Sequence, residues 1–211
     1  MAFTLQAYQQ KRPYLFHLTR PENFVRIKQT HHLESAAHLL NLAGQSNSGL
    51  HHRPSDLTIT LDEYLVVVRD QAPFHAGNVD FTGGWNTDRL IKEINRRVFF
   101  WSGSLKGPVG NGRRHFERYQ NDNPIVIRSR FDELVQVNPT KLAYFCKYNS
   151  GSPRSTNGKR SPRGPETFAP GIECMFTPSD VIEVTFLHRV TLPETAEAAL
   201  HYDGPWTPMF R

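Results

Sequence analysis

The chain has 211 residues, of which 38% are hydrophobic and 11% are aromatic. This composition excludes a generally disordered chain and predicts one globular domain, residues 1–211, with a sizeable core. The formal net charge is +5. A basic balance favours phosphate-bearing partners such as a nucleotide or a nucleic acid, although it does not specify a fold.

Cysteine content and the start of the chain bear on the compartment. Cys146 and Cys174 are too few for a disulfide framework and are typical of a reducing compartment. Residues 1–6 contain no apolar stretch of signal-peptide length, and no apolar run approaches the ~20 residues of a membrane helix. We therefore expect a cytoplasmic protein with no membrane partner.

Short strands and helices alternate in the first half of the chain. Residues 13–19 form an apolar strand, after which Pro21 suits the first turn of a helix. A second helix is expected over residues 33–43, and the β-branched run 64–68 predicts a buried strand.

The second half begins with a helix that Thr87 is expected to cap. A strand at 98–101 and a glycine-rich turn at 107–112 then precede a charged helix at 113–120. The remaining elements are expected to be strands at 125–127, 142–145 and 181–192, followed by a short helical tail from Pro193.

The order of these elements favours an α+β fold, because it lacks the regular βα spacing of a doubly wound sheet. No Gly-x-Gly-x-x-Gly follows a predicted strand, so the sequence excludes a Rossmann mode of dinucleotide binding. Residues 149–171 form a polar stretch longer than the ~12–15 residues usual for a structureless connection, which indicates a functional loop.

Polar side chains follow several of the apolar runs at the point where each strand ends. The segments concerned are Phe16 to Phe24, Val68 to Gln71, Arg97 to Trp101 and Ile182 to Val184. Charges at strand ends add little to a core, and the loops there commonly carry binding and catalytic residues. The four segments therefore predict one shared site.

Each segment also has a purely structural interpretation. A histidine at a strand end can bond to backbone, Arg69 can pair with a nearby acid, and an aromatic strand at 99–101 can belong to the core. Alternation along that strand sends Phe99 and Trp101 to one face and Phe100 to the other, so at most one face lines a pocket. Glu183 can be a solvent-facing acid of an edge strand.

Taken together, the segments resemble the ADP-ribosyltransferase superfamily. Phe16-His17-Leu18-Thr19 followed by Asn23-Phe24 is similar to the opening motif of the DarT-type enzymes, in which a strand ends in His-x-Thr before a helix that carries Asn-Leu. Arg69-Asp70-Gln71 and Asn95 to Trp101 are similar to segments of an uncharacterised bacterial family with the same layout. The second strand and the Phe-Phe-Trp segment depart from the DarT pattern.

The resemblance implies an α+β fold with an ADP-ribosyltransferase-like split β-sheet core, flanking helices and NAD as substrate. It implies NAD contacts by His17 and Thr19, with Asn23 in support, and stacking of nicotinamide on aromatic residues of the strand Phe99-Phe100-Trp101. Arg69, with Gln71 beside it, is the candidate catalytic arginine, and Arg53 is its rival.

The resemblance places the catalytic glutamate at the head of a late strand that follows a substrate-recognition loop. Glu183 has that position, and Glu173 is the competitor because it lies nearer the loop. Cleavage of the N-glycosidic bond of NAD builds positive charge on the ribose, and a carboxylate on the 2′-hydroxyl would stabilise that charge.

The loop at 149–171 is expected to present the acceptor. Its cations Arg154, Lys159, Arg160 and Arg163 suit a phosphate backbone, although a charge run of this kind also suits a solvated loop. Two adjacent-histidine pairs, at 31–32 and 51–52, lack further ligands at metal-binding spacing, so no metal site is expected.

The sequence therefore predicts a mono-ADP-ribosyltransferase that uses NAD and modifies DNA or RNA, as a bacterial toxin or phage-defence effector with a possible antitoxin. Two alternatives keep the fold and change the reaction, to NAD hydrolysis or RNA 2′-phosphate transfer. A third is a basic nucleic-acid-binding protein without enzymatic activity.

Overall fold

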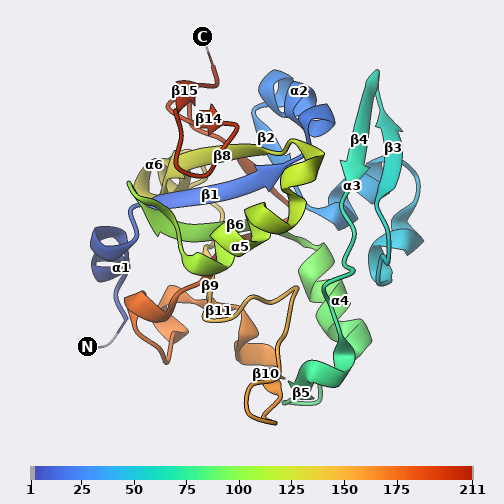
Figure 1. Ribbon diagram of the computed structural model, residues 1–211, viewed down its shortest axis with the longest axis vertical. Coiled ribbons are helices and arrows are strands. Elements are labelled where there is room, and N and C mark those ends of the chain that lie inside the picture. Colours follow the sequence, from blue (N-terminus) through green and yellow to red (C-terminus); the bar gives the residue numbers. More distant parts are fainter. Residues whose placement is uncertain (1–2, 211) are drawn as a thin grey trace.

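An antiparallel sheet forms the centre of the computed structural model, which describes residues 3–210. Its strand order is β11-β9-β12-β6-β1-β8-β14-β15, with β7 paired to β6, and helices lie on both sides of it (Figure 1). The structure confirms the expected α+β class. Among these residues, no helix combines the length and the apolar character needed to cross a membrane.

The helices are short. The α-helices are α1 (Leu5–Lys11), α2 (Pro21–Thr30), α3 (Ala36–Leu42), α4 (Thr87–Asn95), α5 (Gly110–Tyr119) and α6 (Phe131–Gln136). The 3-10 helices are η1 (Ser46–Leu50), η2 (Ala76–Asn78), η3 (Gln120–Asp122), η4 (Pro165–Thr167), η5 (Gly171–Glu173) and η6 (Pro178–Asp180).

The central sheet uses β1 (Tyr14–Thr19), β6 (Arg97–Ser104), β7 (Gly107–Pro108), β8 (Ile125–Arg130), β9 (Tyr144–Cys146), β11 (Ala169–Pro170), β12 (Glu183–Leu187), β14 (Glu197–Ala199) and β15 (Thr207–Pro208). Separate pairs join β2 (His32–Glu34) to β13 (Arg189–Thr191), β3 (Leu57–Leu61) to β4 (Tyr64–Val68), and β5 (Val79–Phe81) to β10 (Ser161–Arg163).

Side chains of β6 point alternately to the two faces of the sheet and pack in two different hydrophobic clusters. Phe100 is buried in the main core with Val184 and Phe186, which β12 contributes. Trp101 points to the other face and packs with Phe16 in a smaller cluster under α5. A Cβ on Gly112 of α5 would lie 2.8 Å from Trp101, so glycine permits this close approach.

The strands β1 and β6 separate part-way along the sheet. Their ladder ends at Phe16 opposite Trp101, whereas β1 stays paired to β8 through Thr19 and β6 stays paired to β12 through Arg97. Beyond that level the sheet opens between its two halves. The hairpin β3–β4 lies beside this opening, near α3 and α4 (Figure 1).

Several sequence-predicted boundaries differ from the structure for local reasons. The helix expected at 33–43 begins only at Ala36, because Leu33 pairs with Val190 between β2 and β13 and Ser35 caps the helix. Asn86 rather than Thr87 caps α4, through a hydrogen bond from the Arg89 N–H.

The expected strand 181–192 is divided at His188, whose φ of 63° is left-handed and ends β12 before β13 begins. The expectation of a helical tail from Pro193 is wrong, since β14 and β15 extend the sheet there. The polar stretch 149–171 contains β10, η4 and β11 in its second half, whereas residues 149–160 include no helix or strand.

Candidate functional site

A cavity of about 280 Å³ lies where β1 and β6 separate, and we call it the Glu183 cavity. Its lining combines strand-end residues of the central sheet with the end of β4, the helices α4 and α5, and the loop after β9. The lining residues used below are His17, Thr19, Asn23, Arg53, Arg69, Gln71, Asn95, Phe99, Trp101, His115, Tyr119, Asn149, Ser150 and Glu183.

Glu183 begins β12, an interior strand flanked by β6 and β9. It pairs with Trp101 on one side and Cys146 on the other, and it is 3% exposed. Paired residues of neighbouring strands point to the same face, so the carboxylate lies on the face that carries Trp101. This placement excludes a solvent-facing acid on an edge strand.

Ser150 holds the Glu183 carboxylate. Its hydroxyl donates to Oε2 at 2.7 Å, and its backbone N–H lies 3.3 Å from both carboxylate oxygens. Burial raises the pKa of Glu183 to about 7, and the Ser150 hydrogen bonds and the charge of Arg163 oppose that rise. A carboxyl of this pKa changes ionisation near neutral pH, as a catalytic acid or base requires.

His17 crosses the gap that opens between β1 and β6. Its Nδ1 lies 2.8 Å from the carbonyl oxygen of Phe99, which can only accept, so Nδ1 carries the proton. Burial lowers the pKa of His17 to about 4, and the ring is therefore neutral at pH 7. Its Nε2 is then an acceptor on a ring that lines the cavity.

Arg69 follows β4 and lies against the ring of Tyr119, 4.1 Å from its centroid. Its Nη1 reaches Asp122 at 3.4 Å. Its Nη2 is buried and has no hydrogen-bond partner among residues 3–210. Burial also lowers the pKa of this guanidinium, which indicates an incompletely compensated cation. A phosphate or a ribose hydroxyl would satisfy the free nitrogen.

Arg53 lines the cavity but is committed to a structural network. Its Nε donates to the Arg69 carbonyl and its Nη1 donates to the Asn95 side chain at 2.8 Å. Gln71 accepts from the Arg53 backbone N–H and donates to Asn95. These bonds fix the end of β4 against α4. The main role of Arg53 and Gln71 is therefore to hold the wall of the Glu183 cavity in place.

The remaining opening-motif residues have different surroundings. Asn23 donates to the Val67 carbonyl at 2.9 Å and accepts from the Val67 N–H at 2.7 Å, which ties α2 to β4. Thr19 is buried and lines the cavity. Asn23 therefore supports the cavity through the hairpin.

The aromatic strand separates into lining and core, as alternation predicts. Phe99 and Trp101 line the Glu183 cavity. Phe100 is 1% exposed and packs edge-on against Phe186 in the main core. The expectation that Phe100 contacts the ligand is therefore not met, because its side chain points to the opposite face of β6.

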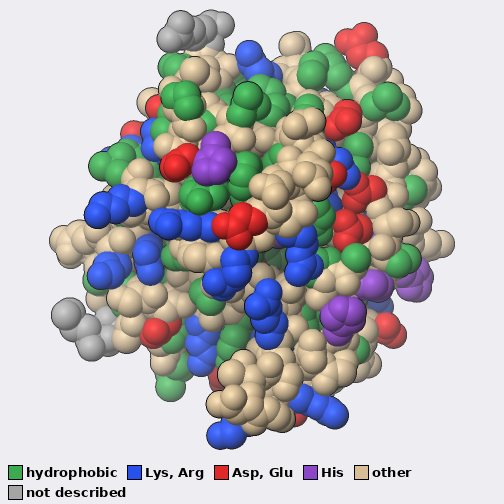
Figure 2. Space-filling view, in the orientation of Figure 1, with side chains coloured by type: hydrophobic (Ala, Val, Ile, Leu, Met, Phe, Trp, Pro, Cys, Tyr) green, Lys and Arg blue, Asp and Glu red, His purple; other side chains and the backbone are tan. Residues whose placement is uncertain are grey.

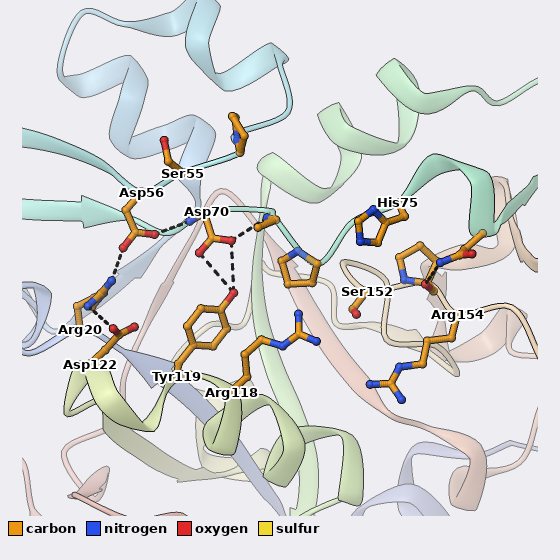
Figure 3. A pocket seen from close by; sticks show the side chains of 15 residues that line it. Arg20, Ser55, Asp56, Asp70, His75, Arg118, Tyr119, Asp122, Ser152 and Arg154 are labelled. Atoms are coloured by element: carbon orange, nitrogen blue, oxygen red, sulfur yellow. Dashed lines mark hydrogen bonds and ion pairs between the residues drawn. The ribbon is translucent and has the colours of Figure 1, made fainter.

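A second cavity of about 600 Å³ adjoins the first, and Asp70, Tyr119 and Ser152 line both. Arg20 pairs with Asp56 and with Asp122 on its wall, and the Tyr119 hydroxyl approaches Asp70 (Figure 3). We call it the outer cavity. Its volume leaves room for a ligand to extend beyond the Glu183 cavity.

A third cavity of about 180 Å³ shares His115, Asn149 and Ser152 with the Glu183 cavity. Cations from three segments line it, namely Arg114, Arg118, Lys147, Arg154 and Arg163. We call it the basic cavity. Figure 2 shows Lys and Arg side chains gathered on the face that carries α5.

The cations predicted to bind nucleic acid have different positions. Arg154 is exposed and lines the basic cavity, whereas Lys159 and Arg160 are exposed on the loop and do not line it. Arg163 is 1% exposed, and its guanidinium is enclosed by loop residues. Arg163 is therefore not a surface cation.

Comparison with known proteins gives a family. The sequence profile of a family of unknown function, DUF7002, matches residues 13–195. The chain belongs to the DUF7002 family. No curated protein and no solved structure matches it significantly. The DUF7002 region spans the chain from β1 through β13 and thus contains His17, Arg69 and Glu183.

Glu173, the rival glutamate, also lies in the DUF7002 region but outside the three cavities described above. It ends η5, and its side chain is exposed. The structure therefore brings Glu183, and not Glu173, to the residues of the predicted site.

Two residues that line the Glu183 cavity, His115 and Tyr119, lie on α5 and were not predicted from the sequence. His115 packs between Trp101 and Tyr119, with ring centroids 5.4 Å and 5.0 Å away. Burial lowers the pKa of His115 to about 3. His115 and Tyr119 are four residues apart on a charged helix, and residues i and i+4 share one helix face. This spacing was the one weak indication in the sequence that the two side chains lie together.

Proposed function

We propose that this protein is an NAD-dependent mono-ADP-ribosyltransferase with an ADP-ribosyltransferase-like split sheet. The observation that carries the proposal is the position of Glu183, buried beside Trp101 in a cavity that also receives His17 and Arg69. Separation of β1 from β6 supports the fold assignment, because it provides a cleft inside a sheet whose strands are otherwise continuous.

In the proposed reaction, the bond between nicotinamide and ribose breaks and its electron pair leaves on nicotinamide. Positive charge develops on the ribose, and Glu183 as carboxylate stabilises it. An oxygen or nitrogen of the acceptor forms the new bond to ribose and loses its proton. Glu183, with a pKa of about 7, is suited to receive that proton.

The other residues supply binding and orientation. The free Nη2 of Arg69 suits an anionic or hydroxyl oxygen of NAD, and Nε2 of His17 suits a hydrogen-bond donor such as a ribose hydroxyl or a carboxamide. Phe99 and Trp101 offer apolar faces for the nicotinamide ring.

The basic cavity supports a nucleic acid as acceptor. Arg114, Arg118, Lys147 and Arg154 line it, and none of them forms an ion pair within residues 3–210. Unpaired cations beside a buried active site suit a phosphate backbone whose base enters the cavity. The basic cavity shares Arg118, Ser152 and Arg154 with the outer cavity, so the two cavities adjoin beside the Glu183 cavity.

The test is nicotinamide release from NAD by the purified protein, with and without single-stranded DNA or RNA, together with mass analysis of the nucleic acid. We expect nucleic-acid-dependent release and an ADP-ribosyl adduct. Equal release without acceptor would favour NAD hydrolysis, and no release with either nucleic acid would contradict the proposal.

A matched pair of variants tests the acceptor route. Arg114→Gln combined with Arg118→Gln should weaken DNA or RNA binding at least several-fold and reduce its dependence on salt. Arg189→Gln removes an exposed cation on β13, outside the three cavities, and should bind like the wild type. If the double variant binds DNA or RNA as tightly as Arg189→Gln does, the basic cavity is not the acceptor route.

A further inference from the structure

Arg163 ties the two ends of the loop 149–163 together. Its Nη2 donates to the Asn149 carbonyl at 2.9 Å, and its Nη1 donates to the Ser161 hydroxyl at 2.6 Å and the Pro162 carbonyl at 2.8 Å. The guanidinium also lies over the ring of Tyr148, 4.4 Å from its centroid. The planar fork of an arginine presents its donors in fixed directions, which suits these spread acceptors better than the single nitrogen of a lysine.

The residue after Asn149 is the one that holds the carboxylate. Ser150 is fully buried and donates from its hydroxyl and its N–H to Glu183. The peptide group between residues 149 and 150 includes both the carbonyl that Arg163 binds and the N–H that faces Glu183. Fixing one end of a planar peptide fixes the other.

We propose that Arg163 is a positioning residue, which sets the geometry of Glu183 by holding the 149–150 peptide and thereby Ser150. Its catalytic consequence rests on the proposed function, because only there does Glu183 act on a substrate. The positioning itself is a property of the protein alone.

Arg163 acts on Glu183 in two ways that an experiment must separate. Its charge lowers the pKa of Glu183 directly, and the hydrogen bonds from Ser150 lower it further. Cys146 on β9 lies opposite Glu183, and the cavity wall carries further titratable or charged side chains. These are His17, Arg20, Glu34, Arg53, Arg69, Asp70, Arg97, His115 and Tyr119. Arg163→Lys keeps the charge but cannot reproduce the fork.

The experiment is carbon-13 NMR titration of side-chain-labelled glutamate in the full protein without NAD, with Glu183→Gln used to assign the signal. We expect Ser150→Ala and Arg163→Lys each to raise the Glu183 midpoint by about one pH unit. The Glu183 midpoint of the double variant should rise by less than the sum of the two single effects, because both substitutions weaken the Ser150 hydroxyl contact while Ser150→Ala leaves the backbone N–H in place. Arg189→Gln should titrate like the wild type.

Ser161→Ala is a milder probe, since it removes one of the acceptors of Arg163 and leaves the arginine in place. It should raise the same midpoint by a smaller amount. A wild-type midpoint in both Arg163→Lys and Ser161→Ala, or full additivity with Ser150→Ala, would overturn the inference. Because no substrate is present, these outcomes are independent of whether the protein cleaves NAD.

Discussion

Ser150 and Glu183 are joined by a short hydroxyl hydrogen bond of 2.7 Å and by a backbone N–H at 3.3 Å from the same carboxylate. They are 33 residues apart in sequence, and both are buried. The contact brings the polar loop after β9 to the head of β12. A carboxylate held in this way is ordered before any ligand arrives, which favours electrostatic catalysis.

The pH dependence of the reaction should follow the ionisation of Glu183. Because burial raises its pKa to about 7, the carboxylate needed for the reaction is formed only as the pH rises through that value. Nicotinamide release under NAD-limiting conditions should therefore increase from acidic to mildly alkaline pH with a midpoint near 7. A rate that is constant across this range would contradict the role assigned to Glu183.

Glu183→Gln should stabilise the protein above neutral pH. The folded state binds the Glu183 proton more tightly than the unfolded state, whose pKa is close to 4.5. The stabilisation that Glu183 contributes is therefore fully present below pH 4.5 and is lost as the pH rises through about 7. The corresponding loss in the free energy of unfolding is on the order of 3 kcal/mol. Glutamine keeps the shape without the charge.

Thermal unfolding at mildly alkaline pH measures that effect. The Tm of Glu183→Gln should exceed that of the wild type there and should approach it near pH 4.5. A lower Tm for Glu183→Gln than for the wild type above neutral pH would show that the Glu183 carboxylate is compensated more fully than its burial indicates.

Arg69→Lys should weaken NAD binding by about 10-fold to 100-fold. Lysine retains a charge but loses both the stacking on Tyr119 and the free Nη2 that suits a ligand oxygen. Calorimetric titration with NAD checks this, with Arg189→Gln as the control. Unchanged affinity in Arg69→Lys would place the NAD phosphates elsewhere.

The neighbours Phe99 and Phe100 should respond oppositely to substitution by leucine. Phe100 is 1% exposed in the main core, so Phe100→Leu should lower stability by roughly 1–3 kcal/mol. Phe99 lines the cavity, so Phe99→Leu should mainly weaken NAD binding. Denaturant unfolding and NAD titration of both variants separate the effects, and an equal loss of stability in both would contradict the alternation.

Several residues of the candidate site could be predicted from the sequence, because the ends of apolar strands can be read from the order of the residues. His17, Arg69, Trp101 and Glu183 each lie at or near the end of an apolar run, and the structure brings them to one cavity. Alternation along β6 also separated Phe100 from Phe99 and Trp101, since side-chain direction in a strand depends only on position.

What the sequence did not show depends on tertiary contacts. The separation of β1 from β6 is a matter of pairing, which no local pattern records. Arg163 looked like a loop cation because sequence gives no measure of burial, yet it is 1% exposed. The strand β14 replaced the expected helix after Pro193 because residues 197–199 find a partner in β8.

The most direct test of the account is nicotinamide release from NAD, measured side by side for the wild type, Glu183→Gln and Glu173→Gln with single-stranded nucleic acid present. Glu183 lies in the cavity, whereas Glu173 is exposed and outside it. The account predicts that Glu183→Gln loses activity by about 100-fold or more while it still binds NAD, and that Glu173→Gln remains active. Full activity in Glu183→Gln would contradict the central claim, whatever the behaviour of Glu173→Gln.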